Sequence, residues 1–144
     1  MNPRPVILAL CTAIGLAACN RPPAPLAAFD PVADLKALAS KLKGAEIPSV
    51  TVDVRKTDSL TAPFVGTISG TEFGKDEKGV LWSVVKFALD LDYREGKWEF
   101  RQCTGNVWRK GQDEKGEQPF VEKAGRFPVC ASGLLKKLGI ESGW

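Results

Sequence analysis

The 144-residue sequence contains no histidine, which excludes much of the common catalytic and metal-binding chemistry. Ser–His and Cys–His nucleophiles and histidine-bound zinc sites all require an imidazole. Ser83 and Lys86 match the spacing of a Ser-x-x-Lys acylation motif, but that chemistry needs a helix to bring both side chains to one side. The residues around them alternate as in a strand, where positions three apart point to opposite faces. No Walker or Rossmann glycine pattern is present either.

Acidic side chains are the remaining candidates for chemistry. In the hairpin described below, Asp92 lies opposite Glu99, and Asp90 shares their face. Like charges directly opposite each other destabilise a sheet, and a bound hard cation would relieve the repulsion. Basic neighbours, Arg94 and Arg101 among them, could do so equally well, and we favour this mixed-charge, solvated face. A carboxylate pair for glycoside hydrolysis would need a cleft, which nothing in the sequence marks.

The first twenty residues have the pattern of an export signal. Arg4 supplies a positive charge, and residues 6–18 form an apolar run that is too short for a membrane span of about 20 residues. Leu16-Ala17-Ala18-Cys19 follows, and Pro22 and Pro23 come shortly after. This stretch resembles the cleavage box of bacterial lipoproteins, in which the cysteine is acylated and becomes the new amino terminus. The alternative is an ordinary secretory signal, with Cys19 left as a thiol.

The resemblance to lipoproteins implies an anchor and a location. It predicts a signal peptide at 1–18, a lipidated tether rich in proline and alanine at 19–29, and one domain at 30–144. Stable anchoring takes two or more acyl chains, and the lipid of this family carries three. In proteobacterial lipoproteins an aspartate after the cysteine commonly retains the protein at the inner membrane, so Asn20 favours the periplasmic face of the outer membrane. The net charge of +3 is too small to predict a nucleic-acid partner.

Two cysteines, Cys103 and Cys130, remain in the predicted domain. Because the periplasm is oxidising, this even pair predicts one disulfide. A redox pair or a metal site is the alternative, but the sequence has no Cys-x-x-Cys spacing. We expect no cofactor.

The first regular element predicted for the domain is a helix from Pro31 to Lys43. Asp30 is a good N-cap, proline is tolerated at the first helical position, and Gly44 follows as a stop. Apolar residues recur on one stripe of this helix: Val32, Leu35, Leu38, Ala39 and Leu42. We expect this stripe to pack on a sheet. The alternative is a basic amphipathic helix that lies on the membrane.

Alternating residues then predict strands at 50–55, 63–73, 81–93 and 98–110, a short strand at 120–121, and a closing helix at 132–138. In the second strand, Gly66 and Gly70 share a face and leave a trough that something bulky could approach. A glycine-containing turn at 94–97 makes the third and fourth strands a hairpin. The predicted pairs are Tyr93 with Trp98, Leu91 with Phe100, Leu89 with Gln102, and Asp90 with Arg101.

One helix followed by four or five antiparallel strands predicts an α+β roll, the element order of cystatin-like and NTF2-like folds. Trp82 and Trp108 are expected on the strand face opposite Leu89 and Leu91, where an exposed pair would mark a partner surface. The alternative is that the linker or the terminal helix covers them.

Three functions follow as hypotheses. The first is a non-catalytic lipoprotein that binds an envelope protein or assembly. The second is a module that binds a small ligand in a hollow between helix and sheet. The third is a hydrolase that uses Asp90, Asp92 or Glu99.

Overall fold

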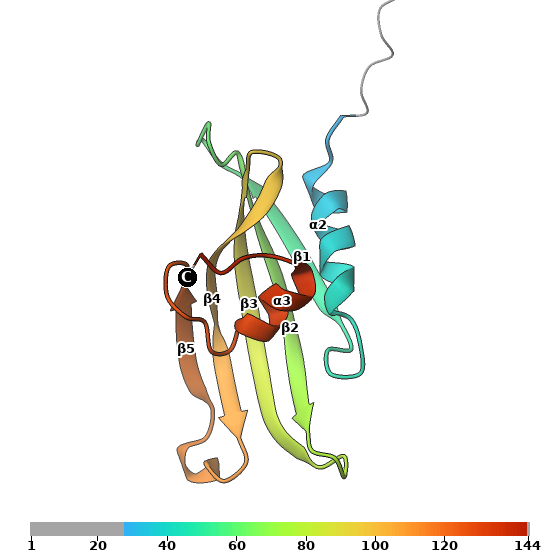
Figure 1. Cartoon of the computed structure of the whole chain (residues 1–144), viewed down its shortest axis with the longest axis vertical. Coiled ribbons are helices and arrows are strands. Elements are labelled where there is room, and N and C mark those ends of the chain that lie inside the picture. Colours follow the sequence, from blue (N-terminus) through green and yellow to red (C-terminus); the bar gives the residue numbers. More distant parts are fainter. Residues whose placement is uncertain (1–27, 144) are drawn as a thin grey trace, which may run out of the picture.

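The computed structural model describes residues 28–143, in which one antiparallel sheet carries two short helices (Figure 1). The five strands lie side by side in sequence order, β1-β2-β3-β4-β5. In chain order the elements are α2 (Pro31–Ala39), the 3₁₀ turn η1 (Ser40–Leu42), β1 (Val50–Lys56), β2 (Phe64–Lys75), β3 (Leu81–Arg94), β4 (Lys97–Arg109), the 3₁₀ turn η2 (Asp113–Lys115), β5 (Gln118–Lys123) and α3 (Ser132–Leu138). The predicted α+β class, with a short closing helix, is confirmed. The helix is not N-terminal, however, because residues precede it. The predicted lipidation site, Cys19, lies outside the described residues.

Helix α2 begins where its capping residue predicts. The Asp30 Oδ1 accepts hydrogen bonds from the backbone N–H groups of Val32 and Ala33, at 3.0 and 3.1 Å, and so satisfies donors that have no partner within the helix. After Ala39 the helix tightens into η1, which ends before the predicted boundary. Leu35, Ala39 and Leu42 are buried. Most of the apolar stripe therefore packs in the core, whereas Val32 at its start is 39 % exposed.

The hairpin of β3 and β4 has the predicted register near its turn, where Tyr93 pairs with Trp98 and Leu91 with Phe100. The turn residues Glu95 and Gly96 have φ angles of 49° and 80°, as a two-residue type I′ turn requires.

Farther from the turn, a bulge between Asp90 and Leu91 shifts the register of this hairpin. Asp90 faces Gln102 and Leu89 faces Cys103, so the predicted pairs of Asp90 with Arg101 and Leu89 with Gln102 are wrong. The reason is that the apolar residues of β4 change phase. Trp98 and Phe100 occupy even positions, whereas Cys103 and Val107 occupy odd ones, and all four are buried. One extra residue keeps both sets on the core face.

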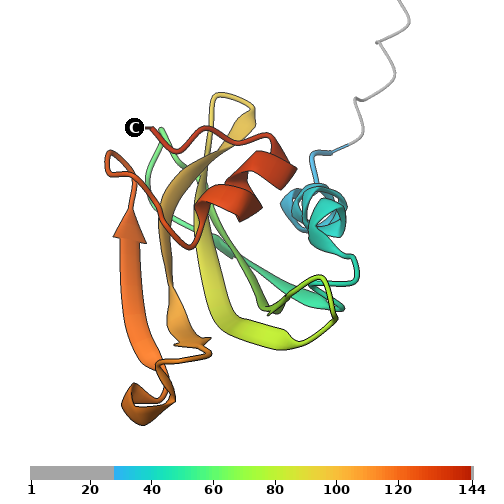
Figure 2. The ribbon, with the colours of Figure 1, turned by 60° about the horizontal axis from the view of Figure 1, so that its bottom comes forward.

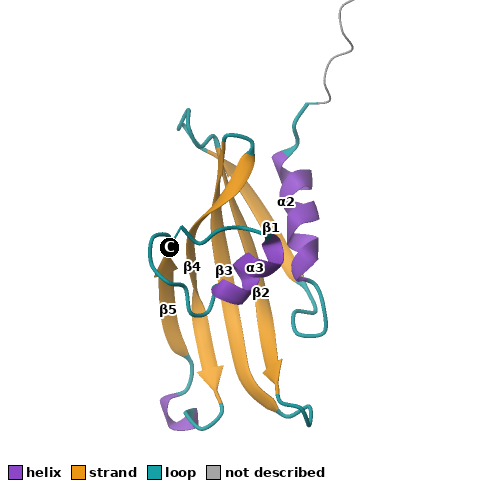
Figure 3. Ribbon diagram, in the orientation of Figure 1, coloured by secondary structure: helices purple, strands orange, loops and turns teal. Residues whose placement is uncertain are grey.

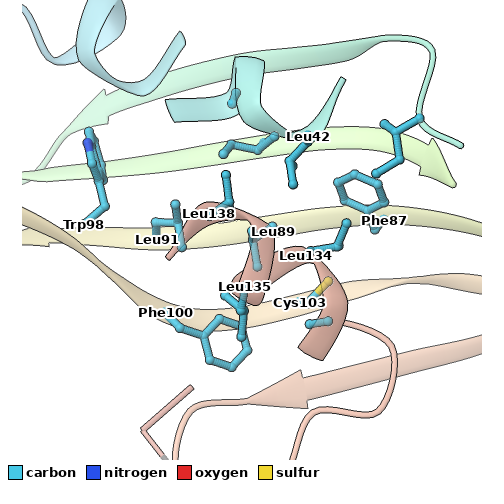
Figure 4. Close-up of a cluster of buried hydrophobic side chains, with 14 of the residues drawn as sticks. Leu42, Phe87, Leu89, Leu91, Trp98, Phe100, Cys103, Leu134, Leu135 and Leu138 are labelled. Atoms are coloured by element: carbon cyan, nitrogen blue, oxygen red, sulfur yellow. The ribbon is translucent and has the colours of Figure 1, made fainter. Parts of the chain in front are cut away.

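The core lies between the helices and the sheet, which curls around α2 and α3 (Figures 2 and 3). Figure 4 shows the leucines of α3 against the inner residues of β3 and β4. The predicted trough at Gly66 is filled, because a β-carbon there would overlap the Leu35 side chain and lie 3.0 Å from Trp98. Trp98 Nε1 also donates a hydrogen bond of 2.8 Å to Asp34 of α2.

Helix α3 is held to the sheet by a carboxylate on β5. The side chain of Glu122 accepts hydrogen bonds from the backbone N–H groups of Val129, Cys130 and Ala131, at 2.6 to 2.9 Å. These groups lead into the first turn of α3, which has no side-chain cap of its own. A negative charge is also favourable there because of the helix dipole.

Cys103 and Cys130 are both free thiols, so the predicted disulfide is wrong for this structure. Cys103 is fully buried and pairs across the sheet with Glu122. The Glu122 carboxylate binds the backbone of Cys130, so hydrogen bonds rather than a covalent link fix the loop to the sheet. Burial, with a contribution from the Glu122 charge, raises the pKa of Cys103 to about 12.

Candidate binding cleft

A cleft of about 310 Å³ opens at the end of the sheet that is remote from the β3–β4 hairpin. Two rows of cross-strand neighbours continue the inner face of the sheet beyond the core. The first row is Glu72, Val85 and Val107, and the second is Gly74, Ser83 and Arg109. The loop at Glu46 and the segment at Val129 and Cys130 also line the cleft. The site is thus assembled from three strands and two connecting segments.

Trp82 lines the cleft because of a bulge at the end of β2. Gly74 pairs with Ser83 and Lys75 pairs with Leu81, so Trp82 is an extra residue on β3. Atoms of its indole ring lie 3.2 Å from the position of a β-carbon on Gly74. Since Gly74 has no side chain, the ring can pack there while 48 % of Trp82 stays exposed. The bulge carries the ring to the core side of the sheet.

Trp108 lies elsewhere. It pairs with Val84 on the outer face of the sheet and is half-buried. The prediction that Trp82 and Trp108 share the outer face is therefore wrong for Trp82, because simple alternation does not hold across a bulge. Val129, of which 66 % is exposed, also lines the cleft.

The charges around the cleft are paired on one wall only. Glu46 forms an ion pair of 3.5 Å with Lys137. Glu72 lies near the same ion pair. Partial burial raises the pKa of the Glu72 carboxyl group; the positive charge of Lys137 lowers this pKa in part, and the negative charge of Glu46 raises it further. On the other wall Arg109 lies beside Cys130, close enough to lower the pKa of the thiol. Within residues 28–143, no carboxylate lies within 4.0 Å of Arg109.

Cys130 contributes a weakly polar thiol to the cleft. Burial raises the pKa of this thiol, and Glu122 adds to the rise, whereas the Arg109 charge and hydrogen bond lower it. A thiol held neutral in this way is a poor nucleophile. The polar floor of the cleft therefore suits binding better than covalent chemistry.

The predicted carboxylate cluster lies on the opposite face from the core and is internally compensated. Asp92 does face Glu99, as predicted. Asp90 accepts hydrogen bonds from Thr67 and Gln102, at 2.7 and 2.8 Å. Ion pairs link Arg94 to Asp92 and Glu99, and Arg101 to Asp92, at 3.6 to 3.9 Å. No group of three or more metal-ligating side chains occurs in the part of the chain that the structure describes. Basic neighbours thus offset the repulsion between Asp92 and Glu99.

Ser83 and Lys86 point to opposite faces, as the strand reading predicts. Ser83 is buried on the core face, whereas the Lys86 Nζ lies 2.7 Å from the Glu117 carboxylate. No serine–lysine pair is formed.

A second hollow, of about 700 Å³, lies beneath the 139–143 segment. Its aromatic lining offers little surface, since Trp98 and Phe100 are only 7 % and 6 % exposed. The space between α2 and the sheet is filled by the core, with Leu35, Ile68 and Leu89 fully buried. The second hollow itself borders the helices and the sheet, since Leu38 of α2, Leu138 of α3 and Phe100 of β4 line it, and the small-ligand module stays a prediction.

Sequence reasoning missed Glu46, Glu72 and Arg109 as candidate site residues. Glu72 and Arg109 become neighbours only through the register of three strands, which no local pattern encodes, and Glu46 joins them from the loop before β1. The sequence carries no local signal for these three residues, and its apolar run Val80-Leu81-Trp82 marks only the start of β3. None of the helices in the described range is long and apolar enough to cross a membrane.

No protein-family model, curated protein or solved structure matches this chain at a significant level of similarity.

Proposed function

We propose that this protein is a lipoprotein of the periplasmic face of the outer membrane that binds another envelope protein through the cleft. The observation that carries the proposal is the pair of exposed apolar side chains, Trp82 and Val129, beside a polar cleft. Exposed aromatic residues next to a concave polar surface are typical of protein-binding sites. The sequence around Cys19 supports the anchor. The element order supports a roll of the cystatin-like or NTF2-like type, a comparison that carries no function.

The arrangement of the domain suits this function. In Figure 1 the chain enters α2 near the end of the sheet that carries the β3–β4 hairpin, whereas the strand ends that form the cleft lie at the opposite end. Residues 19–27 reach at most about 30 Å when fully extended. A lipid on Cys19 would therefore keep the start of α2 within about 30 Å of the bilayer, while the cleft lies at the other end of the sheet.

A crosslinking pull-down from intact cells tests the binding surface. We expect Trp82→Ser and Val129→Ser to remove one or more partners that the natural protein captures. Trp108→Ser is the matched control, because this tryptophan lies on the other face of the sheet. An unchanged partner list for both cleft variants would count against the cleft. The anchor is tested separately by mass spectrometry of the natural protein, in which an unmodified thiol at Cys19 would refute lipidation.

A further inference from the structure

We infer that the cleft recognises a carboxylate group of the partner protein, with Arg109 as its anchor and Trp82 and Val129 beside it. This inference rests on the proposed protein-binding function and names the chemistry that the site would select. Three observations carry it: the pairing of charges around the cleft, the donors that face it, and the apolar residues next to those donors.

Among the described residues, the ion pairs around the cleft leave Arg109 without a carboxylate partner. Glu46 and Glu72 are served by Lys137, which lies 3.5 Å from the Glu46 carboxylate and acts on Glu72 as well. Within residues 28–143, Arg109 has no carboxylate within 4.0 Å, and it lines the cleft beside the Cys130 thiol. The four charged side chains that line the cleft, Glu46, Glu72, Lys75 and Arg109, sum to zero, so the preference for an anion is local to the wall that holds Arg109. A half-buried guanidinium loses hydration without gaining an ion pair, so an incoming anion would be favoured at this wall.

The available donors suit a carboxylate. A guanidinium carries five N–H groups in a planar fork, and a neutral thiol can use only one or two of them. The rest match the two oxygens of a carboxylate in bidentate geometry. The hydroxyl of Ser83, the cross-strand neighbour of Arg109, and the indole N–H of Trp82 belong to the same cleft.

The apolar residues indicate that the carboxylate belongs to a polypeptide. Trp82 and Val129 are 48 % and 66 % exposed and line the same cleft as Arg109. A free inorganic anion would leave both side chains in water, whereas an apolar residue next to a carboxylate would cover them. The carboxylate could be a chain terminus or an acidic side chain, and the experiment separates these two sources.

Three short peptides test the inference against the full mature protein. The first, acetyl-Ala-Ala-Val, ends in a free carboxylate; the second is its amide; the third is an amide with an internal glutamate. Binding is followed by NMR at the indole N–H of Trp82, assigned by its loss in Trp82→Phe. We expect the free acid to bind at least tenfold more tightly than the amide. Tight binding of the third peptide as well would assign any carboxylate, and its failure would assign the chain terminus.

Variants of two arginines make the test specific. Arg109→Gln should weaken the acid by about tenfold to 100-fold, as expected for loss of a charged hydrogen-bonding group, and leave the amide unchanged. Arg109→Lys should restore part of the affinity, because it keeps the charge but not the fork. Arg101→Gln is the control, since this arginine is exposed on the outer face. Equal affinity for acid and amide, or equal effects of Arg109→Gln and Arg101→Gln, would overturn the inference.

The two proposals fail in different ways. If Trp82→Ser abolishes capture of a cellular partner but Arg109→Gln does not, protein binding at the cleft stands and carboxylate recognition falls. If neither variant changes the captured partners while the peptides still distinguish acid from amide, the cleft binds carboxylates but is not the surface for the envelope partner.

Discussion

Glycine substitutions test the packing of the sheet most directly, and the structure ranks three of them. At Gly105 on β4, an added β-carbon would overlap the backbone carbonyl oxygen of Lys86 on β3. At Gly66 on β2, the overlap is with the end of the flexible Leu35 side chain. At Gly133 in α3, no atom lies within 4 Å of the added carbon. The three alanine variants therefore differ in what must move.

The expected energies follow from that difference. Overpacking costs about 1–3 kcal/mol when side chains can adjust, so Gly66→Ala should fall in this range. Relieving the overlap in Gly105→Ala requires β3 and β4 to separate, which also weakens ladder hydrogen bonds worth about 1 kcal/mol each. We expect Gly105→Ala to lower the free energy of unfolding by about 3 kcal/mol or more. Gly133→Ala should stabilise the protein by about 0.5 kcal/mol, because alanine reduces the entropy of the unfolded chain.

Urea unfolding followed by tryptophan fluorescence measures these energies, and Trp98 provides a signal because it is only 7 % exposed. With a denaturant dependence of about 2 kcal/mol per M, Gly105→Ala should lower the midpoint by about 1.5 M. Gly133→Ala serves as the control for a glycine change that introduces no overlap. A midpoint for Gly105→Ala within about 0.3 M of the natural protein would refute the β3–β4 register at this position.

Three further predictions concern ionisable groups. Glu122→Ala should destabilise the protein by on the order of 3 kcal/mol, because charged hydrogen bonds to three backbone N–H groups are lost; faster amide exchange in α3 would show it, and unchanged exchange would contradict the anchoring role. Cys130 should react with iodoacetamide before Cys103, whose pKa is raised to about 12, and equal reactivity of the two thiols in the folded protein would argue against the burial of Cys103. Because the fold favours the neutral Cys103 thiol, the stability that this thiol contributes should be lost as the pH rises from about 9 toward 12. The pKa of Glu72 is raised by burial, so its ionisation opposes folding; Glu72→Gln should therefore raise the urea midpoint more at pH 7 than at pH 4, and a lower midpoint at pH 7 would show that the carboxylate is needed.

Features encoded by a few neighbouring residues could be predicted from the sequence. The cap at Asp30, the turn at Glu95-Gly96 and the alternation in β3 each depend on local backbone preference or on a side-chain period. The absence of histidine is likewise a property of the sequence alone. These features were enough to predict the α+β class, the start of α2 and the register near the hairpin turn.

What the sequence did not determine depends on competition between distant segments. The bulge at Asp90–Leu91 forms because two apolar sets on β4 must reach one core, and the bulge at Gly74–Lys75 brings Trp82 to the cleft instead of to the face of Trp108. The loop at Cys130 is held by a carboxylate from β5, a contact that cysteine count alone cannot predict. The cleft around Arg109 exists only once the rows of three strands are aligned. Local preferences fix the elements, but the register that places charged side chains together is settled by burial across the whole sheet.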